Sequence, residues 1–73
     1  MYRDIKKIFG RKIAALRQKQ LLSQEELADR CNIHRTYMGS IERGEKSPTL
    51  NTIKKIADGL SVLIKDFFTD ETE

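Results

Sequence analysis

The apolar residues near the start of the chain recur at steps of three and four positions. They are Ile5, Ile8, Phe9, Ile13 and Leu16. This spacing places them on one stripe of an α-helix, and it predicts a first helix over residues 4–20. Gly10 lies inside this segment, where a glycine lowers helix stability by about 1 kcal/mol relative to alanine.

Two shorter helices are predicted next. Ser23 and Glu26 form a capping-box pair, which starts a helix over residues 24–30. After a turn of about three residues, a third helix begins at residue 34 or 35 and continues to residue 43. Two short helices joined in this way form a helix-turn-helix pattern at about 24–43, in which the second helix lies in the major groove of DNA.

A fourth helix is predicted after a polar loop at residues 45–49. Thr49 can cap this helix, while Pro48 keeps the preceding residues out of it. Gly59 and Ser61 mark its end. The apolar stripe of the helix consists of Leu50, Ile53, Ile56, Ala57 and Leu60.

The C-terminal segment is short and ends in acidic residues. Residues 62–68 predict a last short helix or turn anchored by Phe67 and Phe68, and residues 70–73 an acidic tail that is expected to fray. Since no strand pattern interrupts the helical periodicity, the sequence predicts an all-α fold. We expect a compact bundle of five short helices in a single domain over residues 1–73.

The third predicted helix has two chemically different sides. At about 100° per residue, its apolar side consists of Tyr37, Met38 and Ile41. The opposite side is centred on Thr36, Gly39 and Arg43 and is flanked by Arg35 and Ser40. Arginine can donate to guanine as a fork, hydroxyls can donate or accept, and glycine lets the backbone approach a groove closely. This side is therefore suited to read base edges.

Charge is distributed unevenly along the 73 residues, whose net charge is +3. Residues 1–46 hold eleven basic and six acidic side chains, a balance of +5, while residues 47–73 hold three and five, a balance of −2. The first part therefore suits a polyanion. A chain of this length buries only about 60% of its unfolded surface, which favours a second copy as a source of additional core.

The residue types argue against several other classes of protein. One cysteine, Cys31, and one histidine, His34, cannot build an ordinary zinc site, so we expect no metal and no other cofactor. A single cysteine fits a reducing cytoplasm, and we interpret Cys31 as a small buried turn residue. Apolar runs are too short to span a membrane, and neither a phosphate loop nor a catalytic partner for His34 is visible. We expect neither an enzyme nor a small-molecule ligand.

Short motifs follow one another from residue 23 to residue 50. They are Ser23-Gln24-Glu25-Glu26-Leu27-Ala28, then Ile33 and Met38, then Ile41-Glu42-Arg43-Gly44-Glu45, then Ser47-Pro48-Thr49-Leu50. In this order and spacing they resemble the Xre/Cro family of helix-turn-helix regulators, which are similar to the phage lambda repressor and Cro. The resemblance covers residues 8–68. Within the family, Arg35-Thr36-Tyr37 before Ile41-Glu42-Arg43-Gly44 is similar to the controller proteins of restriction–modification systems.

The resemblance implies a lambda-repressor-like fold and a cytoplasmic transcription regulator, either activator or repressor. It implies a homodimer on pseudo-palindromic double-stranded DNA, with half-sites roughly 34 Å apart. The residues implied to read bases are Arg35, Thr36 and Ser40. Those implied to contact the DNA backbone are Gln24, Tyr37, Arg43 and Lys46. Arg17 and Glu42 match a family pair that joins the first helix to the third. The implied dimer interface, formed by the last helices, contains Ile64, Phe67 and Phe68.

Several positions need separate comment. Asn32 replaces a common turn glycine and is expected to adopt the left-handed conformation. His34 can cap the third helix, stay solvated or touch a phosphate, and Tyr37 can lie at the rim of the core or donate to a phosphate. Two adjacent phenylalanines cannot both point inward, so one of them is expected to meet a partner chain. The basic cluster near the N-terminus is either a solvated face or a DNA contact: Lys6, Lys7, Arg11 and Lys12.

Two functions from different classes follow. The first is a homodimeric, sequence-specific DNA-binding regulator, of the kind in which a controller protein regulates its own gene. The alternative is an antitoxin-type or other protein-interaction module on the same fold, with the Phe67–Phe68 end and the acidic tail as its functional surface.

Overall fold

The computed structural model describes residues 4–68 of the chain. In order, these form α1 (Ile5–Lys19), α2 (Gln24–Cys31), α3 (Arg35–Glu42), α4 (Leu50–Leu60) and a 3-10 turn, η1 (Ile64–Phe67). The all-α prediction is confirmed, and the helix ends lie within about one residue of the predicted ones. The predicted acidic tail at residues 70–73 lies outside the described residues.

The C-terminal segment corrects the prediction of five helices, because residues 4–68 contain four α-helices followed by η1. In η1 the N–H of Asp66 donates to the carbonyl of Leu63, and the N–H of Phe68 donates to the carbonyl of Lys65. These are the i→i+3 bonds of a 3-10 turn. The segment has four residues, which is too short for a stable α-helix.

Local side chains determine where the α-helices begin and end. The oxygens of Ser23 and Glu26 complete the predicted capping box at the start of α2, with bonds of 3.0 and 2.8 Å. Asn32 ends α2 in the left-handed conformation, at φ 60°, as expected. Ser61 does the same for α4, at φ 58°. The side chains that cap α1, α3 and α4 belong to Asp4, His34 and Thr49.

The core collects side chains from all five elements. It consists of Phe9, Ile13, Leu27, Ala28, Cys31, Met38, Ile41, Ile56, Ala57, Leu60 and Phe67. The interpretation of Cys31 as a buried residue is confirmed, since it is 2% exposed. Ile5 and Ile8 share the apolar stripe of α1 but lie outside the core, 51% and 38% exposed.

Gly10 brings the backbones of α1 and α3 together. A Cβ at this position would lie 2.5 Å from the carbonyl oxygens of both Ile41 and Glu42. The residue that weakens α1 as an isolated helix therefore permits its close packing against the end of α3.

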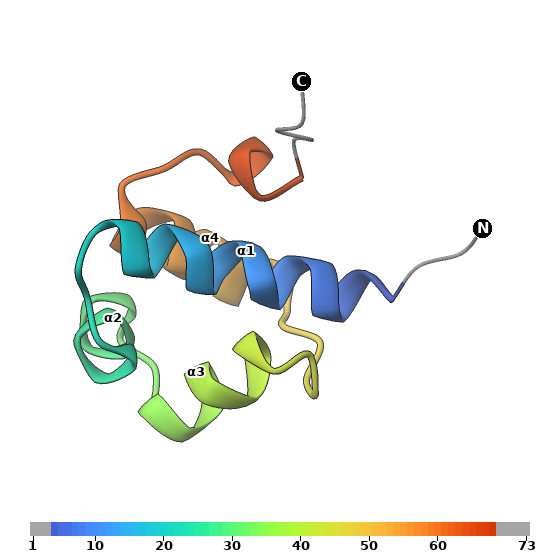
Figure 1. Cartoon of the computed structure of the whole chain (residues 1–73), viewed down its shortest axis with the longest axis horizontal. Coiled ribbons are helices and arrows are strands. Elements are labelled where there is room, and N and C mark those ends of the chain that lie inside the picture. The colour runs from blue at the N-terminus through green and yellow to red at the C-terminus, as the bar shows by residue number, and fades with distance from the viewer. Residues whose placement is uncertain (1–3, 69–73) are drawn as a thin grey trace.

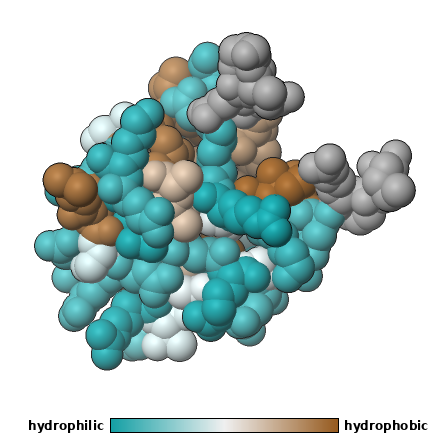
Figure 2. Space-filling model, in the orientation of Figure 1, coloured by the Kyte–Doolittle hydropathy of each residue, from teal (hydrophilic) through white to brown (hydrophobic). Residues whose placement is uncertain are grey.

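α1 crosses the middle of the molecule, with α3 below it and η1 above it in the view of Figure 1. α1 contacts both of these elements, and α2 contacts α3 and α4. The lower part of the same view, over α3, is mostly hydrophilic in Figure 2. The molecule therefore presents α3 and the C-terminal turn on opposite sides of α1.

The interior of the described part of the chain offers no free binding groups. Every buried side-chain nitrogen or oxygen in residues 4–68 has a hydrogen-bond partner. The same residues contain no cluster of three or more His, Cys, Asp or Glu side chains that could hold a metal ion. None of the described helices is both long and apolar enough to cross a membrane.

Candidate nucleic-acid interface

The turn between α2 and α3 positions the first residues of α3. Nδ1 of His34 accepts a hydrogen bond from the backbone N–H of Thr36 at 3.0 Å, which is the role of a helix cap. The capping interpretation of His34 therefore agrees with the structure. Arg35 and Thr36 begin the helix here, and both are exposed.

An open hollow lies between the start of α2 and one side of α3. We call this side, which carries Arg35, Thr36, Gly39 and Arg43, the front of α3. The hollow is lined by Gln24, Arg35, Thr36, Gly39 and Arg43. A Cβ at Gly39 would lie 3.1 Å from Nη1 of Arg43 and 3.4 Å from Oε1 of Gln24, so both side chains reach over the glycine. The structure thus brings four of the predicted DNA-contacting residues into one surface, where Arg35, Thr36 and Arg43 supply hydrogen-bond donors around a glycine.

Ser40 does not belong to this surface. It is 7% exposed, and its hydroxyl donates to the carbonyl of Tyr37 at 2.7 Å. A serine that bonds back to its own helix has no hydroxyl proton left for a base. The prediction that Ser40 reads bases is therefore corrected on this ground, because α3 turns its side chain toward the molecule rather than toward the front.

Two other predicted contacts lie at the edges of the front. Tyr37 is half-buried and packs against the core, which agrees with its interpretation as a residue at the rim of the core. Lys46 is exposed in the loop after α3. Neither residue lines the hollow.

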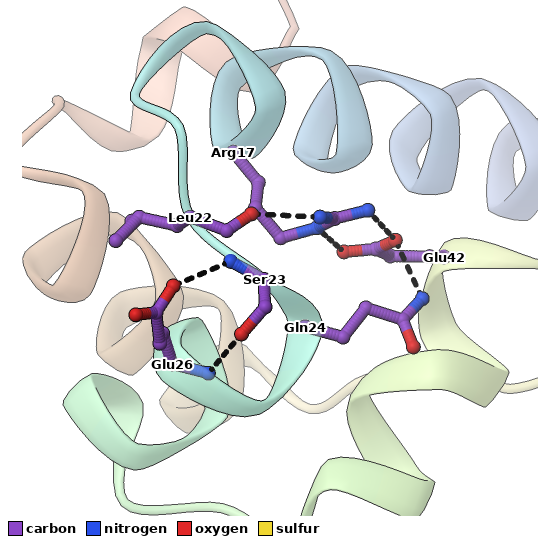
Figure 3. A network of polar contacts seen from close by, with 6 residues as sticks. All are labelled: Arg17, Leu22, Ser23, Gln24, Glu26 and Glu42. Atoms are coloured by element: carbon purple, nitrogen blue, oxygen red, sulfur yellow. Dashed lines mark hydrogen bonds and ion pairs between the residues drawn. The ribbon is translucent and has the colours of Figure 1, made fainter.

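The predicted partners Arg17 and Glu42 lie side by side in a network of polar contacts that includes Gln24 (Figure 3). Nε and Nη2 of Arg17 donate to the two carboxylate oxygens of Glu42 at 2.8 and 3.0 Å. Nη1 of Arg17 also donates to the carbonyl of Leu22 at 2.8 Å. These bonds join α1 to the end of α3, because Arg17 belongs to α1 and Glu42 is the last residue of α3. They also join α1 to the turn before α2, which contains Leu22.

Gln24 belongs to the same network, which the sequence pattern did not indicate. Its Nε2 donates to Oε1 of Glu42 at 2.9 Å, and its Oε1 lies on the Gly39 side. The amide nitrogen carries two N–H donors, and the bond to Glu42 uses one of them. The backbone N–H of Gln24, at the start of α2, remains suited to an anion.

Two carboxylates on the rim of the hollow were not predicted from the sequence. Nε and Nη2 of Arg43 donate to Glu45 at 2.8 and 3.2 Å, and Nη1 of Arg35 lies 3.5 Å from Glu25. The hydrogen bond from Arg43 lowers the pKa of Glu45, and the charges of Arg43, Lys7 and Lys46 lower it further. Glu45 is therefore ionised and lies among cations. Only its spacing from Arg43, two residues, could have suggested this pair.

The predicted dimer residues separate into two groups. Phe67 is 2% exposed, and its ring meets that of Phe9 edge to face at 5.1 Å between centroids. Its assignment to the dimer interface is corrected, because its side chain fills the core of its own chain. Phe68 and Ile64 are 54% and 39% exposed, so the expectation that only one of the two phenylalanines points inward is confirmed.

Comparison with known proteins places this arrangement in a family. The family described as Helix-turn-helix (HTH_3) matches residues 13–67. Control protein C.BamHI of Bacillus amyloliquefaciens is 43% identical over 67 residues, which cover 90% of this chain and 83% of that protein. Control protein C.MunI of Mycoplasma sp is 40% identical over 68 residues, 92% of each chain.

A solved structure agrees with the sequence relatives. The crystal structure of the restriction-modification controller protein C.AhdI from Aeromonas hydrophila is similar with a TM-score of 0.85 and 35% identity. The match covers 86% of this chain and 96% of that one. The chain therefore belongs to the helix-turn-helix family, as its resemblance to the Xre/Cro regulators predicts, and within it is similar to restriction–modification controller proteins.

Proposed function

We propose that this chain is a sequence-specific DNA-binding transcription regulator of the restriction–modification controller type, acting as a homodimer. The observation that carries the proposal is the front of α3. There, exposed Arg35, Thr36 and Arg43 surround Gly39 on a helix whose other side is packed into the core. Such a front can enter the major groove while the rest of the molecule holds its orientation.

Different residues are proposed to position the protein and to read the sequence. Arg35 and Thr36 face base edges from the first turn of α3. Lys46, exposed beyond the end of α3, and the backbone N–H of Gln24 face phosphates. The Arg17–Glu42 fork holds α3 at a fixed angle to α1 and α2. The base contacts and the phosphate contacts therefore keep a fixed position relative to each other.

The proposed dimer uses the side of the molecule opposite α3. Ile64 and Phe68 are exposed there, while the front of α3 stays free for DNA. A two-fold dimer of this kind presents two copies of α3 to successive turns of the major groove, roughly 34 Å apart. It therefore requires a pseudo-palindromic site, and the promoter of its own gene is the first place to look for it by footprinting.

The proposal is tested by selecting duplexes from a randomised pool with the full chain and then measuring affinities by fluorescence anisotropy. Arg35→Ala is expected to cost about 1–3 kcal/mol and to relax the preference at one base pair of each half-site. Lys46→Ala is expected to weaken all duplexes alike and to reduce the salt slope by about one.

Lys54→Ala is the matched control for these variants. It removes the same charge from an exposed position on α4, away from the front of α3, and should leave the site preference unchanged. If Arg35→Ala weakens every duplex equally, Arg35 does not read a base. If the wild-type protein enriches no sequence at all, the protein-interaction alternative is favoured instead.

A further inference from the structure

The side chain of Arg43 lies over the front of α3 rather than beyond its end. Although Arg43 is the C-cap residue, its Nη1 and Cζ lie 3.1 and 4.0 Å from the place that a Cβ of Gly39 would occupy. Residues four apart share one face of a helix, so the side chain runs back along the axis. The guanidinium thereby reaches the middle of the hollow that Arg35 and Thr36 also line.

Glu45 holds one edge of this guanidinium. The carboxylate accepts from Nε at 2.8 Å and from Nη2 at 3.2 Å, which is a side-on bidentate pair. The pair is exposed on both sides, 58% for Arg43 and 55% for Glu45, so its contribution to stability is small. The main effect of the pair is to orient the guanidinium plane of Arg43.

The side-on pair leaves the other edge of the guanidinium available. An arginine carries five N–H donors, and Glu45 uses one on Nε and one on Nη2. The remaining hydrogens of Nη1 and Nη2 form the end-on edge, whose spacing matches O6 and N7 of a guanine. The Nη1 end lies over Gly39, in the hollow that Arg35 and Thr36 also line.

We propose that Arg43 reads a guanine in the major groove and that Glu45 is its positioning residue. The proposal rests on the proposed function, since it assumes that the front of α3 enters a DNA groove. It changes the assignment that the family resemblance implies for Arg43, which is a contact with the DNA backbone.

The charge of the pair favours base reading over a phosphate contact. Phosphate binding draws its free energy from cations that replace counterions, and a carboxylate fixed on the arginine opposes this gain. Reading a base requires a planar fork in a set orientation rather than a net charge. Glu45 supplies the orientation in advance, so less side-chain freedom is lost when the base is bound.

The test uses the full chain and a pool of duplexes with a randomised centre, from which wild type, Arg43→Lys and Glu45→Gln each select sequences. Lysine keeps the charge of arginine but has no fork. Arg43→Lys is therefore expected to lose the preference for one G·C pair in each half-site by about tenfold or more. The salt slope and the preferences at other positions should stay as in wild type.

Glu45→Gln is expected to reduce the preference at the same G·C pair by a smaller factor. In an Arg43→Lys background it should reduce that preference no further, because a positioning residue acts through the arginine. The matched control is Asp58→Asn, which removes the carboxylate of the exposed Lys54–Asp58 pair and should change no base preference. Circular dichroism and thermal melting check that all variants fold.

Three results would overturn the inference. If Arg43→Lys keeps every base preference of the wild type and changes only overall affinity, Arg43 is a phosphate contact. If Glu45→Gln strengthens binding to all duplexes by the same factor, Glu45 only repels DNA. If the wild-type protein enriches no sequence, the proposed function fails and this inference fails with it, whereas the first two results leave the proposed function intact.

Discussion

Glu42 shows how one side chain can join three helices. It is the last residue of α3, and its carboxylate accepts from Arg17 of α1 and from Gln24 of α2. The Glu42 side chain is 5% exposed and the Arg17 side chain 12%. A buried ion pair adds little compared with apolar packing, but losing one partner leaves an uncompensated charge. The pair therefore acts mainly as a constraint on the orientation of α3.

Arg17→Ala is accordingly expected to lower the free energy of unfolding by about 3 kcal/mol, measured by urea denaturation. Lys54→Ala, which breaks the exposed Lys54–Asp58 pair, should lower it by less than about 1 kcal/mol. Equal effects of the two substitutions would show that the Arg17–Glu42 fork is no more important to stability than a surface pair.

Cys31 offers a second test at this scale, because burial raises the pKa of its thiol from 9.0 to about 11. At pH 8 the thiolate fraction is then about 100-fold lower than in the unfolded chain. Alkylation of Cys31 by iodoacetamide at pH 8 is expected to be at least about 100-fold slower in the native protein than in concentrated urea. Comparable rates would show that the thiol is not protected by the fold.

The same pKa shift makes stability depend on pH in one direction. The folded state keeps the thiol proton to higher pH than the unfolded state does. The contribution of Cys31 to the free energy of unfolding is therefore complete below pH 9 and declines as the pH rises toward about 11. Urea midpoints at pH 8 and pH 10 measure the decline. Cys31→Ala should reduce it, and an unchanged decline in that variant would assign it to other groups.

At the scale of elements, two glycines have different roles. Gly10 permits the contact between α1 and α3, and Gly39 leaves room for Arg43 on the front of α3. A Cβ at residue 10 would meet rigid backbone carbonyls at 2.5 Å, whereas a Cβ at residue 39 would meet the flexible end of Arg43 at 3.1 Å. Both glycines weaken their own helix as isolated segments. Gly10 is therefore needed for packing between two helices, whereas Gly39 is needed for the arrangement of side chains on the surface.

Gly10→Ala and Gly39→Ala are expected to change stability in opposite directions. Gly10→Ala should lower the free energy of unfolding by about 2 kcal/mol, because overpacking outweighs the gain in helix propensity. Gly39→Ala should raise it by up to about 1 kcal/mol and yet weaken DNA binding, since the methyl group displaces Arg43. Thermal melting and anisotropy measure the two effects, and stabilisation by Gly10→Ala would contradict the close packing of α1 and α3.

At the scale of the whole molecule, two surfaces of different chemistry lie on opposite sides of α1. The α3 side is polar (Figure 2), while the C-terminal side exposes Ile64 and Phe68. Phe68 stacks on Phe9 at 5.7 Å between ring centroids and so extends the apolar core to the surface. This division lets the proposed dimer form without covering the proposed DNA-binding front.

Phe68→Ser is expected to raise the dissociation constant of the proposed dimer by at least about tenfold, as measured by sedimentation equilibrium. Leu21→Ser is the matched control, because Leu21 is 90% exposed and lies in the turn after α1. If the two variants self-associate equally well, the C-terminal side is not the interface.

Much of the fold is predictable because its determinants are local. Ser23 with Glu26 begins a helix, and Asn32 turns the chain, through bonds to neighbours in sequence. The same locality explains the one wrong element, since residues 64–67 carry helical spacing but lack the length for an α-helix. Ser40 and Phe67 were misplaced because the family resemblance that assigned them does not say which side chains of this chain pack into its own core.

The sequence by itself determined the helices, their caps, the helix-turn-helix spacing and the family, since these depend on the order of residues along the chain. Only the tertiary structure decided which polar groups share a surface. It showed that Gln24 is bound to Glu42, that Arg43 lies over Gly39, and that Glu45 is bound to Arg43. The bond between Gln24 and Glu42 depends on how α2 and α3 cross, and such crossings arise from packing between distant segments rather than from any local pattern. The contacts of Arg43 are close in sequence, but they depend on side-chain conformations that the order of residues does not state.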